Sequence, residues 1–302
     1  MTPSSSIVAQ PKTHVWAGWF FAISASLCFS IAPPLTRWVL LAGMQPTILL
    51  FLRFLLSTIL LFAILSATNP ARLRINRQGL LTSLGIGAIT GSAMLSFFWS
   101  LTRIEASMSS MILSTVPLFV LILLAVKGEP FTKRHLIRLA LALLGAYLLI
   151  GPGGKVDMVG IGLAVLAVML FGIQLVLVQW YLIDYDATTV VMYTMISMTL
   201  LIGIWWGIEG VAWQMPNFQE WLVILILVIV STLLARLTLY TAVRHIGSGQ
   251  LSLLTPLETV FTITWSILFL QERLSTIQWM GGFFIVFSAL LAASWSTKSQ
   301  VK

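Results

Sequence analysis

The stretch at residues 16–38, WAGWFFAISASLCFSIAPPLTRW, resembles the stretch at 158–180, MVGIGLAVLAVMLFGIQLVLVQW. With a shift of about 142 residues and no gap, identical residues coincide at Gly18 and Gly160, Ala22 and Ala164, Phe29 and Phe171, Ile31 and Ile173, and Trp38 and Trp180. In the same register Thr47 falls on Thr189. The sequence therefore predicts a duplicated unit, with a first copy over residues 16–151 and a second over 159–295.

The composition places this duplicated unit in a membrane. Hydrophobic residues make up 59% of the chain and charged residues only 9%, whereas about a quarter of the residues of a soluble domain are charged. Apolar runs of about twenty residues are long enough to cross a bilayer as helices, and their continuity argues against a β-barrel. The predicted spans are 16–38, 47–66, 79–101, 106–126, 136–151, 159–182, 188–208, 221–243, 249–270 and 277–295.

Five spans in each copy determine the relation between the two halves. An odd number of spans makes the second copy enter the membrane from the opposite side, so the copies form an inverted repeat. Basic residues concentrate in cytoplasmic loops, and with the N-terminus inside, eleven Lys and Arg fall on the cytoplasmic side against four on the other. We therefore expect an all-α protein of ten helices in the cell (inner) membrane, multi-pass, with both termini cytoplasmic.

The net charge of +8 does not indicate a nucleic-acid-binding protein, because the basic residues lie in short loops at the membrane edges. Residues 1–15 lack the features of a signal peptide and are expected to form a cytoplasmic tail. The single cysteine, Cys28, excludes an internal disulfide, and the three histidines are far apart in the sequence. We therefore expect no metal and no cofactor.

Ionisable residues deep in a span are costly unless they are paired or face water, so they are candidate site residues. Arg236 and Glu258 are predicted at similar depth in antiparallel spans. They form either a structural ion pair or a site in which Glu258 accepts a substrate amine or a proton and Arg236 attracts a carboxylate. Arg53, the third such candidate, is predicted in the outer third of the second span, in a different third of the bilayer from Arg236. There its long side chain can reach the interface, which is the favoured alternative to a role in a site.

Polar residues and prolines gather at similar depths in both halves. Proline removes a helical hydrogen bond and frees a carbonyl group, which suits a solute cavity between the repeats. The alternative is ordinary helix packing, because Ser and Thr also permit close helix contacts. The predicted lining residues are Ser30, Gln174, Ser114 and Thr255, and the predicted helix breaks are Pro33, Pro34, Pro117 and Pro256. Trp99 and Tyr240, at nearly equivalent positions of the two copies, are predicted to pack against an apolar or aromatic solute.

Several motifs carry a family resemblance. The first copy contains Trp99-Ser-Leu-Thr-Arg-Ile-Glu-Ala-Ser, Pro117-Leu-Phe and Gly128-Glu129-Pro, and the second contains Leu254-Thr-Pro-Leu-Glu-Thr-Val-Phe, Phe269-Leu-Gln-Glu-Arg-Leu and Gly281-Gly282. In this paired order they resemble the EamA-type exporters of the drug/metabolite transporter superfamily over nearly the whole chain. The chain departs from the family pattern at Thr259, where a second proline is common, and at Gln271, where glycine is usual.

The resemblance implies a ten-helix inverted repeat, a central cavity lined mainly by spans 1–4 and 6–9, and efflux of amino acids or related metabolites. The leading hypothesis is therefore a carrier that exports amino acids, aromatic ones included, by alternating access, with proton antiport through Glu258 or facilitated diffusion left open. One alternative is a transporter of phosphorylated metabolites or nucleotide sugars. The other is an intramembrane enzyme or scaffold, which is disfavoured because no span pairs a histidine with a carboxylate or a cysteine. The expected partners are a small-molecule substrate and the lipid bilayer, with no nucleic acid, and a homo-oligomer remains open.

Overall fold

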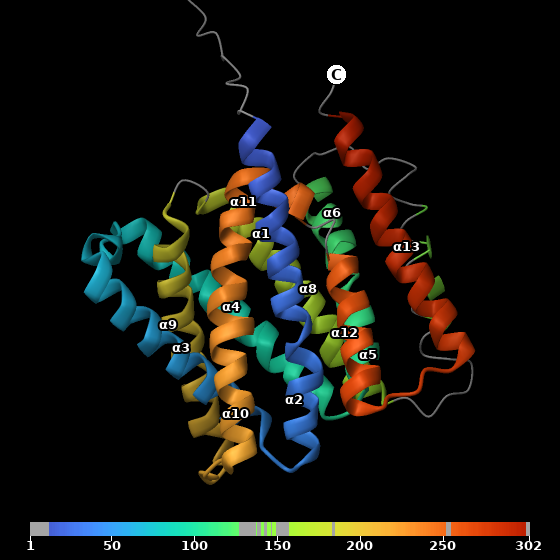
Figure 1. Cartoon of the computed structure of the whole chain (residues 1–302), viewed down its shortest axis with the longest axis horizontal. Helices are drawn as coiled ribbons and strands as arrows, with labels where there is room; N and C mark the ends of the chain where they lie inside the picture. The colour runs from blue at the N-terminus through green and yellow to red at the C-terminus, as the bar shows by residue number, and fades with distance from the viewer. Residues whose placement is uncertain are drawn as a thin grey trace, which may run out of the picture.

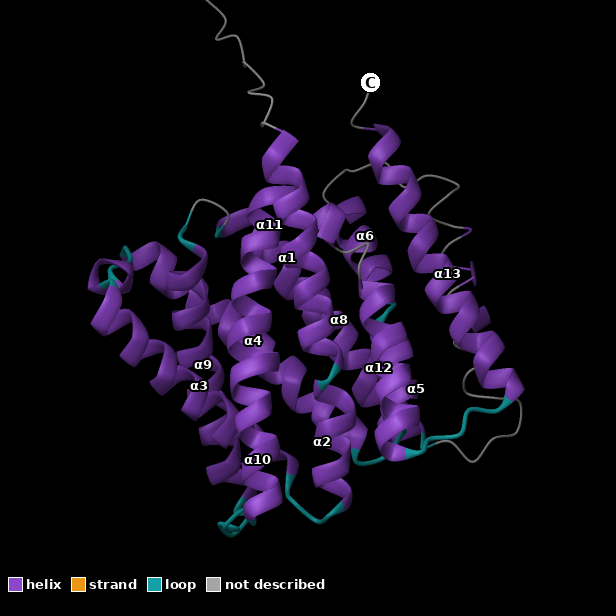
Figure 2. Cartoon of the chain, viewed as in Figure 1, coloured by secondary structure: helices purple, strands orange, loops and turns teal. Residues whose placement is uncertain are grey.

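The computed structural model describes the backbone of residues 12–126, 137, 140–141, 144–145, 147–148, 157–182, 185–251 and 255–299. Within these ranges the secondary structure is helical and includes no strand (Figure 2). The first turn of α1 (Lys12–Ser30) and the last turn of α13 (Thr276–Ser299) lie at the same end of the bundle (Figure 1). We call the opposite end the distal end.

The helices of the first half follow the predicted spans closely. Pro46 begins one of them, because the fixed φ of proline suits a first helical turn, and Asn76 caps another by accepting a hydrogen bond from the backbone of Gly79 at 2.7 Å. Together with α1, the elements are α2 (Ala32–Leu41), α3 (Pro46–Thr68), η1 (Pro70–Leu73), α4 (Arg77–Leu101), α5 (Ala106–Leu113) and α6 (Val116–Val126).

The second half begins at Asp157, whose carboxylate caps the next helix by accepting hydrogen bonds from Val159 and Gly160. Asp186 caps the following helix in the same way. Together with α13, the elements are α8 (Met158–Tyr181), α9 (Ala187–Glu209), α10 (Phe218–Ile226), the π-helix η2 (Leu227–Leu234), α11 (Ala235–Leu251) and α12 (Thr255–Leu270).

Six helical stretches among the described residues are long and apolar enough to cross a membrane. The fifth predicted span, 136–151, lies largely outside the described residues, so the ten-helix count stays a prediction. The boundary predicted between the eighth and ninth spans is wrong. The helix predicted over 221–243 continues as α11 to Leu251, and α12 begins only at Thr255.

Two predicted spans of the first half contain breaks within their described residues. The first divides at Ile31 into α1 and α2, with Pro33 and Pro34 buried in the first turn of α2. The fourth divides between α5 and α6 just before Pro117. These breaks match the positions of the prolines, which have no N–H to continue a helix. By contrast α8, the counterpart of the broken first span, lacks proline and runs unbroken.

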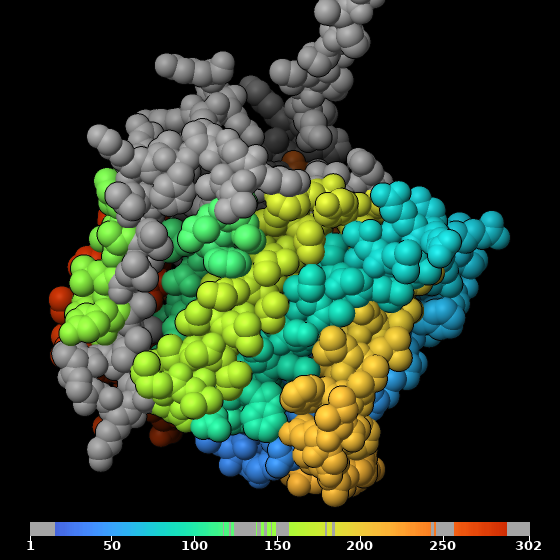
Figure 3. Space-filling view, turned by 180° about the vertical axis from the view of Figure 1, so that it is seen from behind, coloured from blue at the N-terminus to red at the C-terminus, as the bar shows by residue number. Residues whose placement is uncertain are grey.

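Helices of the two halves alternate in space. The first-half helix α1 packs against both α11 and α12 of the second half and lies between them (Figure 1). On the other face α4, in teal, lies between α8 and α9, in yellow-green and gold (Figure 3). The core of the molecule therefore lies mainly between the halves, and large apolar side chains such as Leu200, Ile204 and Ile208 of α9 are exposed on the outer surface.

Close contact between α4 and α9 depends on a glycine. A Cβ atom at Gly87 would lie 2.5 Å from the carbonyl oxygen of Thr194 and 2.6 Å from the Cβ of Ser197. Nearby, the hydroxyl of Ser197 donates to the carbonyl of Leu84 at 2.6 Å. Small residues allow such backbone approach between helices in a membrane.

We therefore expect Gly87→Ala to lower thermal stability in detergent, by roughly 1–3 kcal/mol, because the added methyl group collides with backbone that cannot rotate away. The matched control is Gly85→Ala in the same helix, where a Cβ meets no atom within 4 Å. That change should be neutral or stabilising by about 0.5–1 kcal/mol. Equal shifts in the two melting temperatures would contradict the contact.

Candidate functional site

Arg53 lies inside the bundle, with 2% of its surface exposed. Its Nε donates to the Thr232 hydroxyl at 2.6 Å, and its Nη2 donates to the carbonyl and hydroxyl oxygens of Ser231 at 3.0 and 2.9 Å. The third nitrogen, Nη1, is buried and has no hydrogen-bond partner among the described residues. The expectation that this side chain reaches the membrane interface is therefore wrong, because α3 packs against η2 and turns Arg53 toward it.

The π-helix η2 orients the hydroxyl groups of Ser231 and Thr232 so that they can accept hydrogen bonds from Arg53. Both donate to the carbonyl of Leu227, Ser231 at 3.1 Å and Thr232 at 2.8 Å. A hydroxyl has one proton and two lone pairs, so each keeps its acceptor side for the guanidinium group. Short π-helical segments occur often at functional sites. This one packs against α3, which carries Arg53.

Arg236 follows Thr232 by one helical turn and lies close to Arg53. The Cζ atom of Arg236 is 5.8 Å from the centroid of the Phe54 ring, and the Cζ of Arg53 is 5.5 Å from the same centroid. The two guanidinium groups therefore lie against the same ring, although the two residues are predicted in different thirds of the bilayer. Counting the rise along each helix places Cα atoms but omits the reach of an arginine side chain.

Arg236 is 5% exposed, and no hydrogen bond or ion pair joins it to another described residue. One turn further along α11, Tyr240 lies on the same helix face. The Tyr240 hydroxyl lies beside Gln174 and Thr194, but it makes no hydrogen bond of normal geometry within the described part of the chain. The structure thus brings together three of the predicted site residues, Arg236, Tyr240 and Gln174, and adds Arg53 and Thr194.

Glu258 lies apart from this cluster, in the first turn of α12, and is partly buried. The ion pairs between described residues are Arg37–Glu272 and Arg103–Asp157, so the pair predicted between Arg236 and Glu258 does not form. The reason is the order of the helices. The spans that carry Arg236 and Glu258 are consecutive in sequence, but α1 packs between them.

Other predicted lining residues bind helix backbone. The Ser30 hydroxyl donates to Leu27 and accepts from Trp265 Nε1 at 3.2 Å, which fastens the α1–α2 break to α12. The Ser114 hydroxyl donates to Met111 at 2.6 Å at the end of α5. Trp99 is partly buried near the end of α4. The side chains of Thr255, Pro256 and Pro117 lie outside the described residues.

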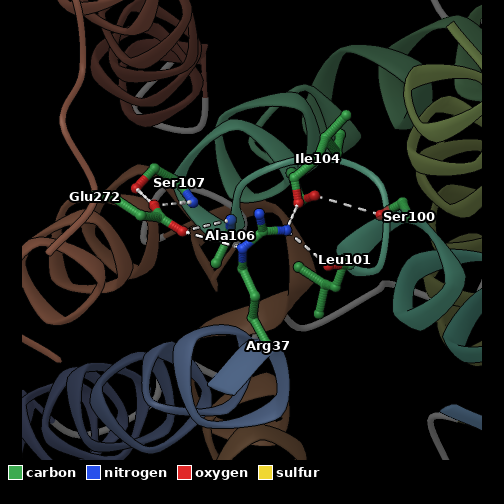
Figure 4. A network of polar contacts seen from close by, with 8 residues as sticks. Arg37, Ser100, Leu101, Ile104, Ala106, Ser107 and Glu272 are labelled. Atoms are coloured by element: carbon green, nitrogen blue, oxygen red, sulfur yellow. Dashed lines mark hydrogen bonds and ion pairs between the residues drawn. The ribbon is translucent and has the colours of Figure 1, made fainter. Parts of the chain in front are cut away.

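A second polar cluster lies at the distal end and joins three segments (Figure 4). Arg37 of α2 forms an ion pair with Glu272 at 3.5 Å and donates to the carbonyls of Leu101, at 2.7 Å, and Ile104. Glu272 also accepts hydrogen bonds at the start of α5, from the backbone of Ala106 at 2.9 Å and from the backbone and hydroxyl of Ser107. We call Arg37, Glu272 and their partners the distal network.

Two features adjoin this network. Gln271, directly before Glu272, has φ of 54°, in the left-handed region that favours glycine. This is the position where the family pattern has glycine. Burial raises the pKa of the Glu105 carboxyl, and the neighbouring Glu272 raises it further against a smaller opposite effect of Arg37. Oε2 of Glu105 is buried and has no hydrogen-bond partner among the described residues.

Sequence reasoning missed Arg53, Thr194 and the distal network as parts of a site. For Arg53 a signal was present, since Ser231 and Thr232 are adjacent polar residues inside the apolar run 221–243. A polar pair at that depth needs partners on another helix, and Arg53 supplies them. Glu272 belongs to one of the paired motifs, but nothing in the sequence indicates its contact with Arg37.

Comparison with known proteins agrees with this architecture. The model of the EamA-like transporter family matches the chain twice, over residues 16–151 and 158–294. A solved structure titled "Crystal structure of protein" is similar over 96% of this chain and 100% of its own, with 18% sequence identity and a TM-score of 0.68, which supports the fold alone. No curated protein sequence matches the chain. Because the family model covers both halves, the chain is a multi-pass membrane protein that belongs to the EamA-like transporter family.

Proposed function

We propose that the protein is a secondary transporter of the cell (inner) membrane that exports amino acids and related small metabolites by alternating access of its two halves. The proposal assigns binding and release of a solute to the chain, and no covalent chemistry. It includes the ten-helix inverted repeat with cytoplasmic termini that the sequence predicts.

One observation carries this proposal, namely that buried hydrogen-bond donors without partners converge from both halves. Arg53 comes from the first half, and Arg236 and Tyr240 come from the second. Unpaired charges inside an apolar bundle are costly and mark solute pathways in membrane proteins. A small metabolite with a carboxylate group supplies the acceptors that these donors lack.

The same cluster also favours a second candidate, a transporter of phosphorylated metabolites. Such a solute needs converging basic residues, and both guanidinium groups lie against the ring of Phe54. A phosphate group carries up to two negative charges and balances two arginines, whereas a carboxylate balances one. Nucleotide sugars belong to the same class of anionic solute.

Alternating access requires the distal end to open. The distal network joins α2 and the start of α5, from the first half, to the loop between α12 and α13, from the second. We propose that this network is the closed distal gate. Opening it separates Arg37 from Glu272 and returns Glu105 to water.

The transport proposal is tested by efflux of a labelled amino-acid panel from liposomes that contain the purified protein. We expect saturable efflux of some panel members, and at least about a tenfold loss in Arg236→Ala, because each charge-assisted hydrogen bond contributes roughly 1.5–3 kcal/mol. Arg103→Ala, which removes only an exposed ion pair with Asp157, is the control. Absence of flux for amino acids and for phosphorylated solutes alike would favour a scaffold or an intramembrane enzyme.

Proton coupling depends on Glu258, the only carboxylate that lies deep in a predicted span. We expect Glu258→Gln to transport solute but to lose the dependence of exchange on a pH gradient. Exchange is measured in liposomes with an imposed gradient. Unchanged pH dependence in this variant would remove Glu258 from the coupling mechanism and leave facilitated diffusion or another proton carrier.

Glu105 makes the closed distal gate sensitive to pH. Because its pKa in the folded protein is raised above the ordinary 4.5, the folded state holds a proton that the unfolded state releases, and stability falls as the pH rises from about 4.5 toward neutral. We expect Glu105→Gln to raise the melting temperature at neutral pH and to flatten this decline. The control is Glu220→Gln at the exposed start of α10, where glutamine can still accept the capping hydrogen bond from the backbone of Asn217; this variant should keep the decline with rising pH. A wild-type profile in Glu105→Gln would contradict the role of Glu105.

A further inference from the structure

Three buried donor groups without partners lie together where α3, η2 and α11 meet. They are Nη1 of Arg53, the guanidinium group of Arg236 and the hydroxyl of Tyr240. We propose that Arg53, Arg236 and Tyr240 form the subsite that binds the anionic oxygen group, a carboxylate or a phosphate, of the transported solute. This inference rests on the proposed transport function and names the chemical group that the site recognises.

The cluster contains two buried positive charges. The guanidinium groups of Arg53 and Arg236 both lie against the ring of Phe54. The Cζ of Arg53 is also 5.7 Å from the ring centroid of Phe98. Phe54 and Phe98 are fully buried. No described carboxylate forms an ion pair with either arginine. Two like charges in an apolar surrounding repel one another strongly, and an anion bound beside them attracts both and offsets that repulsion.

The arrangement of the hydrogen-bond donors also suits an anionic oxygen group. Arg53 is fixed by Ser231 and Thr232 through two of its nitrogens, so its remaining Nη1 has a defined position. Arg236 keeps its whole planar fork, which matches the two oxygens of a carboxylate or phosphate. The Tyr240 hydroxyl adds a neutral donor one turn away. A fixed donor, a fork and a hydroxyl can together satisfy an oxygen group with several lone pairs.

A structural role for these residues makes a different prediction from a binding role. If Arg236 and Tyr240 mainly held the fold together, removing their polar groups would lower stability. Because neither group has a hydrogen-bond partner among the described residues, we expect Arg236→Gln and Tyr240→Phe to keep or raise the melting temperature. Replacing unpaired buried polar groups is often neutral or stabilising. Arg53→Ala is unsuitable as the main test, since it also removes the bonds to Ser231 and Thr232.

The experiment measures binding by the purified full-length protein in detergent, by calorimetry, with two matched pairs of probes. L-phenylalanine and L-phenylalaninamide differ in the carboxylate, and glycerol 3-phosphate and glycerol differ in the phosphate. We expect the anionic member of at least one pair to bind at least about tenfold more tightly than its neutral-group counterpart. The pair that shows the preference identifies the anion as carboxylate or phosphate.

In the variants, the preference should disappear in Arg236→Gln and shrink in Tyr240→Phe, while Arg103→Gln retains it. Equal binding, or no binding, of both anionic probes would overturn the subsite, as would a full preference in Arg236→Gln. The liposome assay separates the two proposals. Saturable flux without any anion preference leaves the transporter and removes the subsite, whereas anion binding without flux supports the subsite and removes the transport function.

Discussion

The interaction on which this structure depends is the one between Arg53 and the Ser231–Thr232 pair. An arginine inside a bundle of apolar helices must find acceptors on neighbouring helices, because lipid offers none. Here the acceptors belong to the other half of the chain, so satisfying the arginine requires α3 and η2 to be in register. The π-helix contributes by tying both hydroxyl protons to Leu227. Phe54 and Phe98 lie against this fixed guanidinium group, and Arg236 lies against the same Phe54 ring.

The distal network and the cluster around Arg53 and Arg236 differ in character. In the distal network, Arg37 and Glu272 are paired and their hydrogen bonds are shared among α2, α5 and the α12–α13 loop, while the neighbouring Glu105 has no hydrogen-bond partner for its Oε2 among the described residues. Between α3 and α11, donors outnumber acceptors. A satisfied network suits a contact that holds one conformation, and an unsatisfied one suits a place where a solute completes the bonding. This contrast is the physical basis for assigning a gate to one level and recognition to the other.

The sequence predicted what depends on local hydropathy and proline. Most described helices begin and end within a few residues of the predicted spans, and both described breaks lie beside Pro33–Pro34 and Pro117. The predictions from the sequence failed where the position of a side chain depends on which helices are neighbours. Arg236 and Glu258 are on consecutive spans, but α1 packs between them. Arg53 was placed by the rise of its own helix, which carries no information about side-chain direction. The departure at Gln271 was visible in sequence, and the structure gives its physical meaning as a left-handed residue that costs about 1 kcal/mol outside glycine.

The alternation of first-half and second-half helices also constrains how the protein is made. Synthesis proceeds from the N-terminus, so Arg53 enters the membrane 179 residues before Thr232, its hydrogen-bond partner, exists. During that interval α1 lacks α11 and α12, and α4 lacks α8 and α9. Until the second half is made, Arg53 therefore lacks its hydrogen-bond acceptors, and α1 and α4 lack the helices against which they pack. The packed bundle can therefore be completed only after the second half has entered the membrane.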